Sequence, residues 1–347
     1  TWTTDGTPDG PKIGSSAINP VSMLDMISDK SDVKAFVGSL QFDYKFHFLP
    51  ELRANVNVSY DYSNSDGGKY VSPNSPSGYG SNVDQSGSQS HYENTYKNTL
   101  FESYLQYAKE LPSIRSRFDV MGGYSYQSYK QDKNDVTYYL SRDPDRFGEE
   151  TTPSQNYKED PLKYVLISFY GRANYTFMDR YLFTFTLRND GSSRFANDNR
   201  WGLFPSLALG WRMNEESFLK NVDYLSNLKL RLGWGKTGQQ DLGEGAERWY
   251  PSGVSWSWGK GGAMFPMYDS AGNVTWVNVI KPVAANPDLK WETTATWNVG
   301  IDYGFLNNRI NGSVDLYHRK TTDLLNTQVS VPAGKDFAEI LPDNIGT

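Results

Sequence analysis

The stretch Lys163–Asn189, KYVLISFYGRANYTFMDRYLFTFTLRN, contains two runs in which apolar and polar side chains alternate. Odd positions from Val165 to Phe177 and from Tyr181 to Leu187 are apolar apart from Gly171, whereas even positions carry mainly Ser, Thr, Asn and Arg. A period of two residues is typical of a β-strand with two chemically different faces. The short break Met178–Arg180 then predicts that the two strands form a hairpin.

The same pattern recurs along the chain and predicts ten strands in five hairpins. The other four pairs are Phe36–Phe48 with Leu52–Tyr62, Leu100–Lys109 with Arg117–Lys130, Ser206–Arg212 with Leu228–Thr237, and Thr293–Phe305 with Ile310–Lys320. Links within the hairpins are short, and the long loops between hairpins are predicted at 63–95, 131–162, 190–201 and 238–291. This asymmetry is typical of outer-membrane β-barrels. Strands of ten or more residues also exceed the usual five or six of a soluble sandwich.

The two faces of these strands predict which side meets lipid. The apolar positions carry many aromatic residues, as a lipid-facing surface with interfacial girdles requires. The opposite positions carry charges that a water-filled or plug-filled lumen tolerates and a packed core does not. We therefore expect four arginines to face the lumen: Arg172, Arg188, Arg231 and Arg319. The alternative is a large soluble antiparallel sheet with one wet face.

Composition narrows the function classes. The 347 residues have a net charge of −6 and include no Cys. The chain therefore offers neither a positive field for nucleic acid nor a thiol for catalysis or zinc. It contains no run of about 18 consecutive apolar residues, so no transmembrane helix is expected.

Motifs that suggest chemistry are incomplete. The tripeptide Gly235-Lys236-Thr237 lacks the earlier glycine and the following helix of a phosphate-binding loop. His47, His91 and His318 have no Glu or Cys at metal-ligand spacing. No nucleophile elbow is present either. The sequence thus predicts neither an enzyme nor a bound cofactor or metal.

The predicted loop at 238–291 is unusually aromatic. Its candidate ligand-binding residues are Trp249, Tyr250, Trp256, Trp258 and Trp276. Aromatic faces stack on sugars and anchor peptides or protein partners. A compact loop that packs its aromatic residues on itself explains the composition equally well.

Both chain ends have loop-like sequences, TWTTDGTPDGPKIGSS at the N-terminus and LPDNIGT at the C-terminus. The first has neither the basic start nor the apolar core of a signal peptide. We therefore expect these residues to be an internal piece of a longer chain.

Three long motifs carry a family resemblance. They are DGSSRFANDNRWGLFPSLALGWRMNEESF from Asp190, LKLRLGWGKTGQQDLG from Leu228, and NPDLKWETTATWNVGIDYGFLNNRINGSVDLYHRKTTDLL from Asn286. In this order they resemble the barrel of SusC/RagA-type TonB-dependent transporters of Bacteroidota, most specifically over Tyr164–Leu325. The resemblance implies an all-β, antiparallel up-and-down transmembrane barrel of 22 strands with an N-terminal plug. Residues 1–347 would then be part of the barrel domain, with the plug and the terminal strands outside this chain.

The resemblance also implies a function and partners. It implies energy-coupled import of a bulky nutrient, an oligosaccharide or in some members a peptide, across the outer membrane. A SusD-like surface lipoprotein would close the extracellular mouth, and the TonB–ExbB–ExbD complex would act through a Ton box near the plug. Lipid would surround such a barrel, and nucleic acid is not an expected partner. A surface adhesin or carbohydrate-binding β-protein remains the alternative.

The resemblance and the charges together suggest roles for individual residues. The lumen arginines are expected to pair with Asp302, Asp315 or carboxylates of the plug. The polar cluster within the stretch Arg188–Trp211 is expected to form a short extracellular link between two strands, without a catalytic role.

Overall fold

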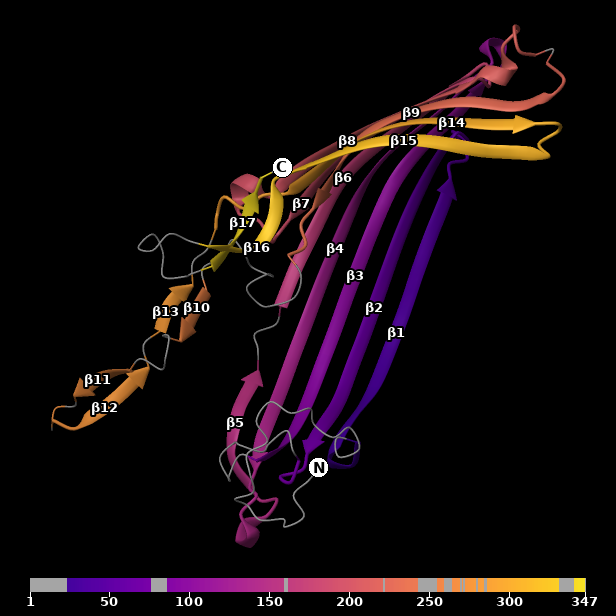
Figure 1. Cartoon of the computed structure of the whole chain (residues 1–347). Coiled ribbons are helices and arrows are strands. Elements are labelled where there is room, and N and C mark those ends of the chain that lie inside the picture. The colour runs from indigo at the N-terminus through magenta and orange to yellow at the C-terminus, as the bar shows by residue number, and fades with distance from the viewer. Residues whose placement is uncertain are drawn as a thin grey trace. The chain divides into compact units, whose positions relative to one another are not determined.

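A computed structural model describes residues 24–75, 86–158, 162–220, 222–242, 255–258, 264–268, 270, 272–278, 280–283, 286–330 and 340–346. Nearly all of its regular structure is antiparallel β (Figure 1). The main sheet has the order β1-β2-β3-β4-β6-β7-β8-β9-β14-β15. These strands are β1 (Ile27–Lys45), β2 (Leu52–Val71), β3 (Gly87–Leu111), β4 (Ser116–Leu140), β6 (Leu162–Phe177), β7 (Tyr181–Ser192), β8 (Trp201–Arg212), β9 (Leu225–Gln239), β14 (Glu292–Phe305) and β15 (Ile310–Thr322).

Smaller elements complete the described structure. β5 (Glu150–Lys158) pairs with β4, and three separate hairpins are β10 (Ser255–Trp258) with β13 (Ile280–Val283), β11 (Met264–Tyr268) with β12 (Val274–Asn278), and β16 (Leu324–Ser330) with β17 (Ile340–Ile345). Single 3-10 turns lie at η3 (Pro112–Ile114), η4 (Pro144–Arg146), η5 (Asn197–Asn199) and η6 (Met213–Glu215). In the described part of the chain, no helix has the length and apolar character needed to cross a bilayer.

The ten predicted strands and their antiparallel order are confirmed, but several predicted loops are wrong. Residues 63–71 belong to β2, residues 87–95 to β3 and residues 131–140 to β4. The predicted loop at 238–291 contains four short strands. Alternation of apolar residues marks a strand only where one face is apolar, whereas ladder hydrogen bonds continue wherever a neighbouring strand is paired. Strand extensions with polar side chains on both faces therefore escape detection from sequence.

The described contacts divide the chain into two compact units. Unit 1 comprises Thr1–Gly38, Ser59–Thr99 and Tyr129–Lys163, and unit 2 comprises Ser39–Val58, Leu100–Ser128 and Tyr164–Thr347. Within unit 1, polar side chains join neighbouring strands: the Asn64 amide donates to Glu93 Oε1 at 3.1 Å and to Thr95 Oγ1 at 2.9 Å. The candidate site lies entirely within unit 2.

Register in unit 2 separates an apolar face from a polar one. Phe185 lies opposite Ala173 and Leu207, while its neighbour Thr184 lies opposite Asn174 and Ala208. The apolar side chains remain uncovered: Phe169 is 53% exposed, and Phe185 is 38% exposed. Contiguous exposed apolar side chains mark contact with a membrane or with another protein. The apolar face is therefore suited to lipid.

A carboxylate joins the strand ends at the link between β8 and β9. Glu216 Oε1 accepts hydrogen bonds from the Tyr181 hydroxyl at 2.6 Å and from Trp211 Nε1 at 3.0 Å, and its Oε2 accepts from Arg180 Nη1 at 2.7 Å. The hydrogen bond from Tyr181, followed by that from Trp211, holds the pKa of Glu216 below its ordinary value. The ionised carboxylate therefore stabilises this end of the sheet.

We expect this contact to weaken in acid. Because the folded-state pKa is lowered, its stabilisation is complete above the pKa of an unfolded Glu, about 4.3, and is lost as the pH falls through the folded value. NMR measurement of hydrogen exchange at the indole N–H of Trp211 should show that its protection decreases as the pH falls below about 4.3. Glu216→Gln should remove this pH dependence, and an unchanged profile in the variant would contradict the assignment.

Candidate functional site

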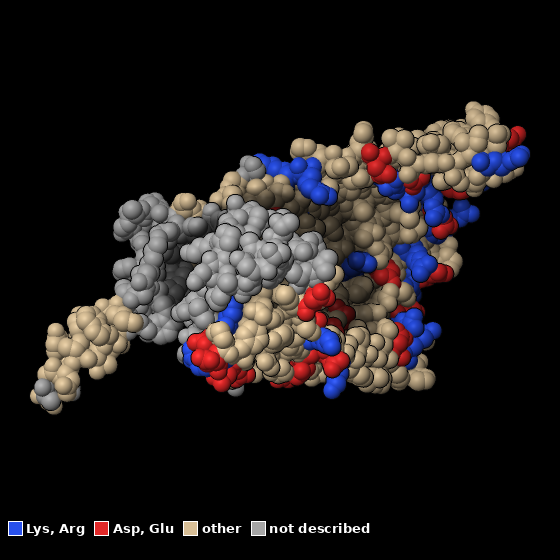
Figure 2. Space-filling view, turned by 60° about the horizontal axis from the view of Figure 1, so that its bottom comes forward, with Lys and Arg blue, Asp and Glu red and all other residues tan. Residues whose placement is uncertain are grey.

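The four predicted lumen arginines all lie on the polar face of unit 2. Paired residues in adjacent strands form a transverse row: Arg172, Thr186, Ser206, Gly235, Thr296 and Arg319. Arg188 is two residues along β7 from Thr186, and Arg231 lies opposite Gly210 and Gly300 on the same face. That this face lines a lumen stays a prediction. Figure 2 shows cationic and acidic side chains interspersed on the surface in view, without a field of one sign.

Arg231 forms the most extensive ion-pair cluster on this face. Its Nη2 lies 2.8 Å from Asp302 Oδ1, and its Nη1 lies 3.0 Å from Asp315 Oδ1. Gly300 makes this geometry possible, because a Cβ at that position would lie 2.8 Å from Arg231 Cζ. The predicted pairing of a lumen arginine with Asp302 and Asp315 is confirmed for Arg231.

Arg188 has a different partner, and pairing of Arg172 and Arg319 with carboxylates of the plug stays a prediction. Arg188 pairs with Asp190, at 2.7 Å from Nε to Oδ1, and its Nη2 donates to Ser168 Oγ at 2.8 Å. Among the residues that the structure describes, Arg172 and Arg319 take part in no ion pair. Alternation predicted the face but not the partners, since partners depend on strand register.

A chain of hydrogen bonds crosses the same face through residues that sequence analysis did not select. The Gln106 amide donates to Asp119, the Asn174 amide donates to Asp119 Oδ1 at 3.3 Å, and the Thr184 hydroxyl donates to Asn174 Oδ1 at 2.9 Å. These side chains come from β3, β4, β6 and β7. The sequence signal that could have placed them on this face is their even or odd position within each alternating strand. Their juxtaposition depends on pairing across four strands.

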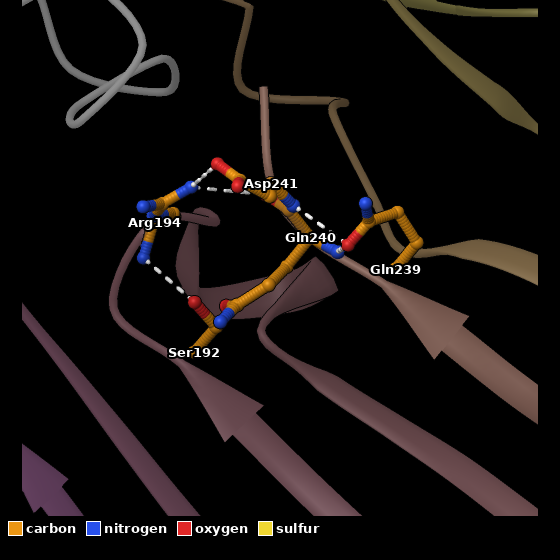
Figure 3. Close-up of polar contacts among 5 residues, drawn as sticks. All are labelled: Ser192, Arg194, Gln239, Gln240 and Asp241. Atoms are coloured by element: carbon orange, nitrogen blue, oxygen red, sulfur yellow. Dashed lines mark hydrogen bonds and ion pairs between the residues drawn. The ribbon is translucent and has the colours of Figure 1, made fainter. Parts of the chain in front are cut away.

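The link after β7 is built around a buried arginine (Figure 3). Arg194 is 5% exposed, and its Nη1 lies 2.8 Å from Asp241 Oδ1. Its backbone N–H donates to Ser192 Oγ at 3.2 Å, and its guanidinium carbon lies 4.4 Å from the centre of the Tyr164 ring. The Gln239 side chain accepts from the next two backbone N–H groups at 2.9 and 3.1 Å. The ion pair thus fastens the link to the segment that follows β9.

A small apolar core lies beside this ion pair. Its buried members are Phe195, Phe204, Leu242, Leu289 and Trp291. The Trp291 ring is 5.4 Å from each of the two Phe rings, and its Nε1 donates to Arg200 O at 2.9 Å. The predicted short link therefore also carries a buried core, which sequence analysis missed because its members come from separate segments.

The predicted ligand-binding aromatics are only partly described. Trp249 and Tyr250 lie outside the described residues, and Trp256 and Trp258 lie in β10 with their side chains outside the description. Trp276 lies in β12 opposite Pro266 and is 61% exposed. The β11–β12 hairpin also exposes Met264, Phe265, Met267, Tyr268, Val274 and Val277. The described part of this hairpin therefore presents apolar side chains outward.

Comparison with known proteins places the chain. A family model described as TonB dependent receptor-like, beta-barrel matches residues 2–347. The TonB-dependent receptor SusC of Bacteroides thetaiotaomicron is 40% identical over 100% of this chain and 32% of its own length. The TonB-dependent receptor P3 of Formosa agariphila is 29% identical over 93% of this chain and 31% of its own length. The chain thus spans about a third of the length of these curated relatives.

A solved structure shows the same fold. The structure of the RagAB peptide transporter matches with a TM-score of 0.72 and 22% identity, over 93% of this chain and 34% of that one. Together with the family match and the relative that aligns along the whole chain, the two-faced antiparallel sheet leads to one conclusion. The chain belongs to the TonB-dependent receptor-like β-barrel family of the bacterial outer membrane.

Proposed function

We propose that this chain forms part of the wall of an outer-membrane TonB-dependent importer for a bulky nutrient. The 40% identity to a TonB-dependent receptor along the whole chain carries this proposal. The uncovered apolar face suits lipid, and the paired charges of the opposite face suit a watery or protein-filled interior. The polar face would then contact the passing solute or a plug.

We propose an oligosaccharide as the solute. Exposed aromatic side chains in the β11–β12 hairpin support this choice, since aromatic rings offer flat apolar faces on which sugars stack. A peptide is the second candidate, because the same exposed aromatic and methionine side chains also suit peptide side chains.

The proposal includes two kinds of partner. A SusD-like surface lipoprotein would cover the extracellular mouth, and the TonB–ExbB–ExbD complex would supply energy through a Ton box outside these residues. The exposed apolar side chains of the β11–β12 hairpin also suit contact with such a lipoprotein.

Uptake by cells that carry the full-length protein tests this function. Cells lacking the gene should lose uptake of the imported class, and loss of TonB should abolish uptake while leaving the protein in the outer membrane. Labelled oligosaccharides and peptides supplied in parallel separate the two solute classes. Binding of a glycan without uptake, insensitive to loss of TonB, would favour a surface adhesin and overturn the transporter.

Trp276→Ala should weaken capture of the solute or of the lipoprotein in the complete protein. Loss of one aromatic contact costs about 0.5–1.5 kcal/mol, or roughly a 2- to 10-fold loss of affinity. Isothermal titration with oligosaccharide and with the purified lipoprotein measures the two effects separately. Tyr224→Ala, at an aromatic residue that is 62% exposed and lies just before β9, is the matched control and should change neither. Unchanged affinity for both would remove the hairpin from the binding surface.

A further inference from the structure

A niche interrupts the hydrogen-bonded side chains on the polar face of unit 2. Register places Asn174, Thr184, Ala208, Gly233 and Asn298 in one transverse row across five strands. Asn174, Thr184 and Asn298 carry amides and a hydroxyl. Ala208 and Gly233, which lie between them, have almost no side chain. The result is a hollow of about 280 Å³ over β7, β8, β9 and β14. Ligand pockets start at about 300 Å³, so the niche fits one side chain or a small end group.

The two charged residues that line the niche are both cations. They are Lys229 and Arg231, and the lining includes no carboxylate. The guanidinium of Arg231 is directed to Asp302 and Asp315, and Asp302 uses both carboxylate oxygens in that contact. Although Lys229 lies opposite Asp302 in the register, it takes part in no ion pair within the described residues. Its charge is therefore available to an anion in the niche.

Neighbouring groups give the niche further selectivity. Gly210 lets the lysine stem lie against the sheet, because a Cβ there would be 3.2 Å from Lys229 Cε. Asn298 makes no side-chain hydrogen bond within the described part of the chain, so its amide can donate to a bound oxygen. Leu182, also in the lining, adds an apolar wall. A short aliphatic group that ends in an acceptor anion matches this combination.

We propose that the niche binds a carboxylate, with the Lys229 ammonium as counter-ion and the Asn298 amide as hydrogen-bond donor. The inference rests on the proposed function, because it requires that the polar face enclose a compartment. The carboxylate has two possible sources, an acidic side chain of the same protein outside these 347 residues or an acidic group on a solute. Both offer the same chemistry to the niche.

Carbodiimide coupling of the purified full-length protein tests the proposal. The reagent activates a carboxylate, and a lysine amine in contact displaces the resulting urea and loses a proton to form an amide. If the carboxylate belongs to the protein, mass spectrometry should find Lys229 joined to an acidic residue outside these 347 residues. If it belongs to a solute, Lys229 should be propionylated in the presence of ¹³C-labelled propionate, about ten-fold faster than the exposed Lys236 of the same strand. The first product identifies a protein carboxylate and the second a solute carboxylate.

Internal controls keep this result interpretable. Lys290 Nζ lies 2.8 Å from Asp323 Oδ1, so these two residues should couple in every sample. Lys229→Arg keeps the charge but forms no stable amide, so it should abolish the product, and Gly233→Leu should fill the niche and reduce it at least about ten-fold. Coupling of Lys229 to Asp302 alone, or its failure to couple while Lys290 does, would overturn the niche. Because the readout does not depend on uptake, a protein that fails to transport can still confirm or contradict the niche.

Discussion

Phe185→Arg should destabilise the full-length protein in lipid vesicles by about 2–4 kcal/mol, because it places a guanidinium on the lipid side of a strand. Phe185 lies in the interior of β7 on the apolar face, opposite Ala173 and Leu207, and is 38% exposed. In a membrane this exposed area contacts hydrocarbon, which cannot solvate the charge. Denaturant titration of the vesicle-inserted protein measures the change in unfolding free energy.

The adjacent residue provides the matched control. Thr184→Arg places the same side chain on the polar face, in the lining of the niche, and loses one hydrogen bond, to Asn174. We expect a cost of roughly 1 kcal/mol. Equal destabilisation by both variants would contradict the lipid-facing assignment and favour a soluble sheet with water on both faces.

Phe195→Ala should open the link between β7 and β8 without unfolding the sheet. Phe195 is 1% exposed and packs against Trp291, so its truncation leaves a cavity in a core with few other members. Such truncations cost about 3–5 kcal/mol. The backbone amides of Asn199 and Leu289, both hydrogen-bonded within this region, should therefore exchange roughly 100- to 4000-fold faster with deuterium.

A second truncation separates this effect from a general loss of stability. Phe218→Ala removes the same side chain from a position that is 65% exposed in the link between β8 and β9, and it should leave these exchange rates unchanged. Amides within β7 should keep their protection in both variants. Unchanged exchange at Asn199 and Leu289 in Phe195→Ala would show that the small core does not hold the link.

Much of the fold was accessible from the sequence because alternation is a local property. The run at 181–187 shows its two faces within seven residues, whichever strand lies beside it. Strand ends were harder to predict. β3 begins at Gly87, well before the predicted start at Leu100. The sequence pattern missed this part of the strand because its residues carry no apolar face. There the ladder bonds of the sheet, and not side-chain pattern, define the strand.

The candidate site shows the same division. The sequence by itself determined that Arg172, Arg188, Arg231 and Arg319 share the polar parity of their strands, and its long motifs determined the family. Only the tertiary structure decided which partners these arginines contact. Arg231 and Asp302 lie 71 residues apart in the chain, and Arg194 and Asp241 lie 47 apart.

Register explains why the sequence could name Asp302 and Asp315 as candidate partners but could not assign a partner to each arginine. A shift of one residue between β9 and β14 would move every facing side chain to the other side, and a shift of two would exchange the partners while preserving the alternation. The niche around Lys229 and the core around Phe195 depend on such pairings across several strands. Alternation along each strand thus fixed the faces, while long-range pairing and packing selected the neighbours on each face.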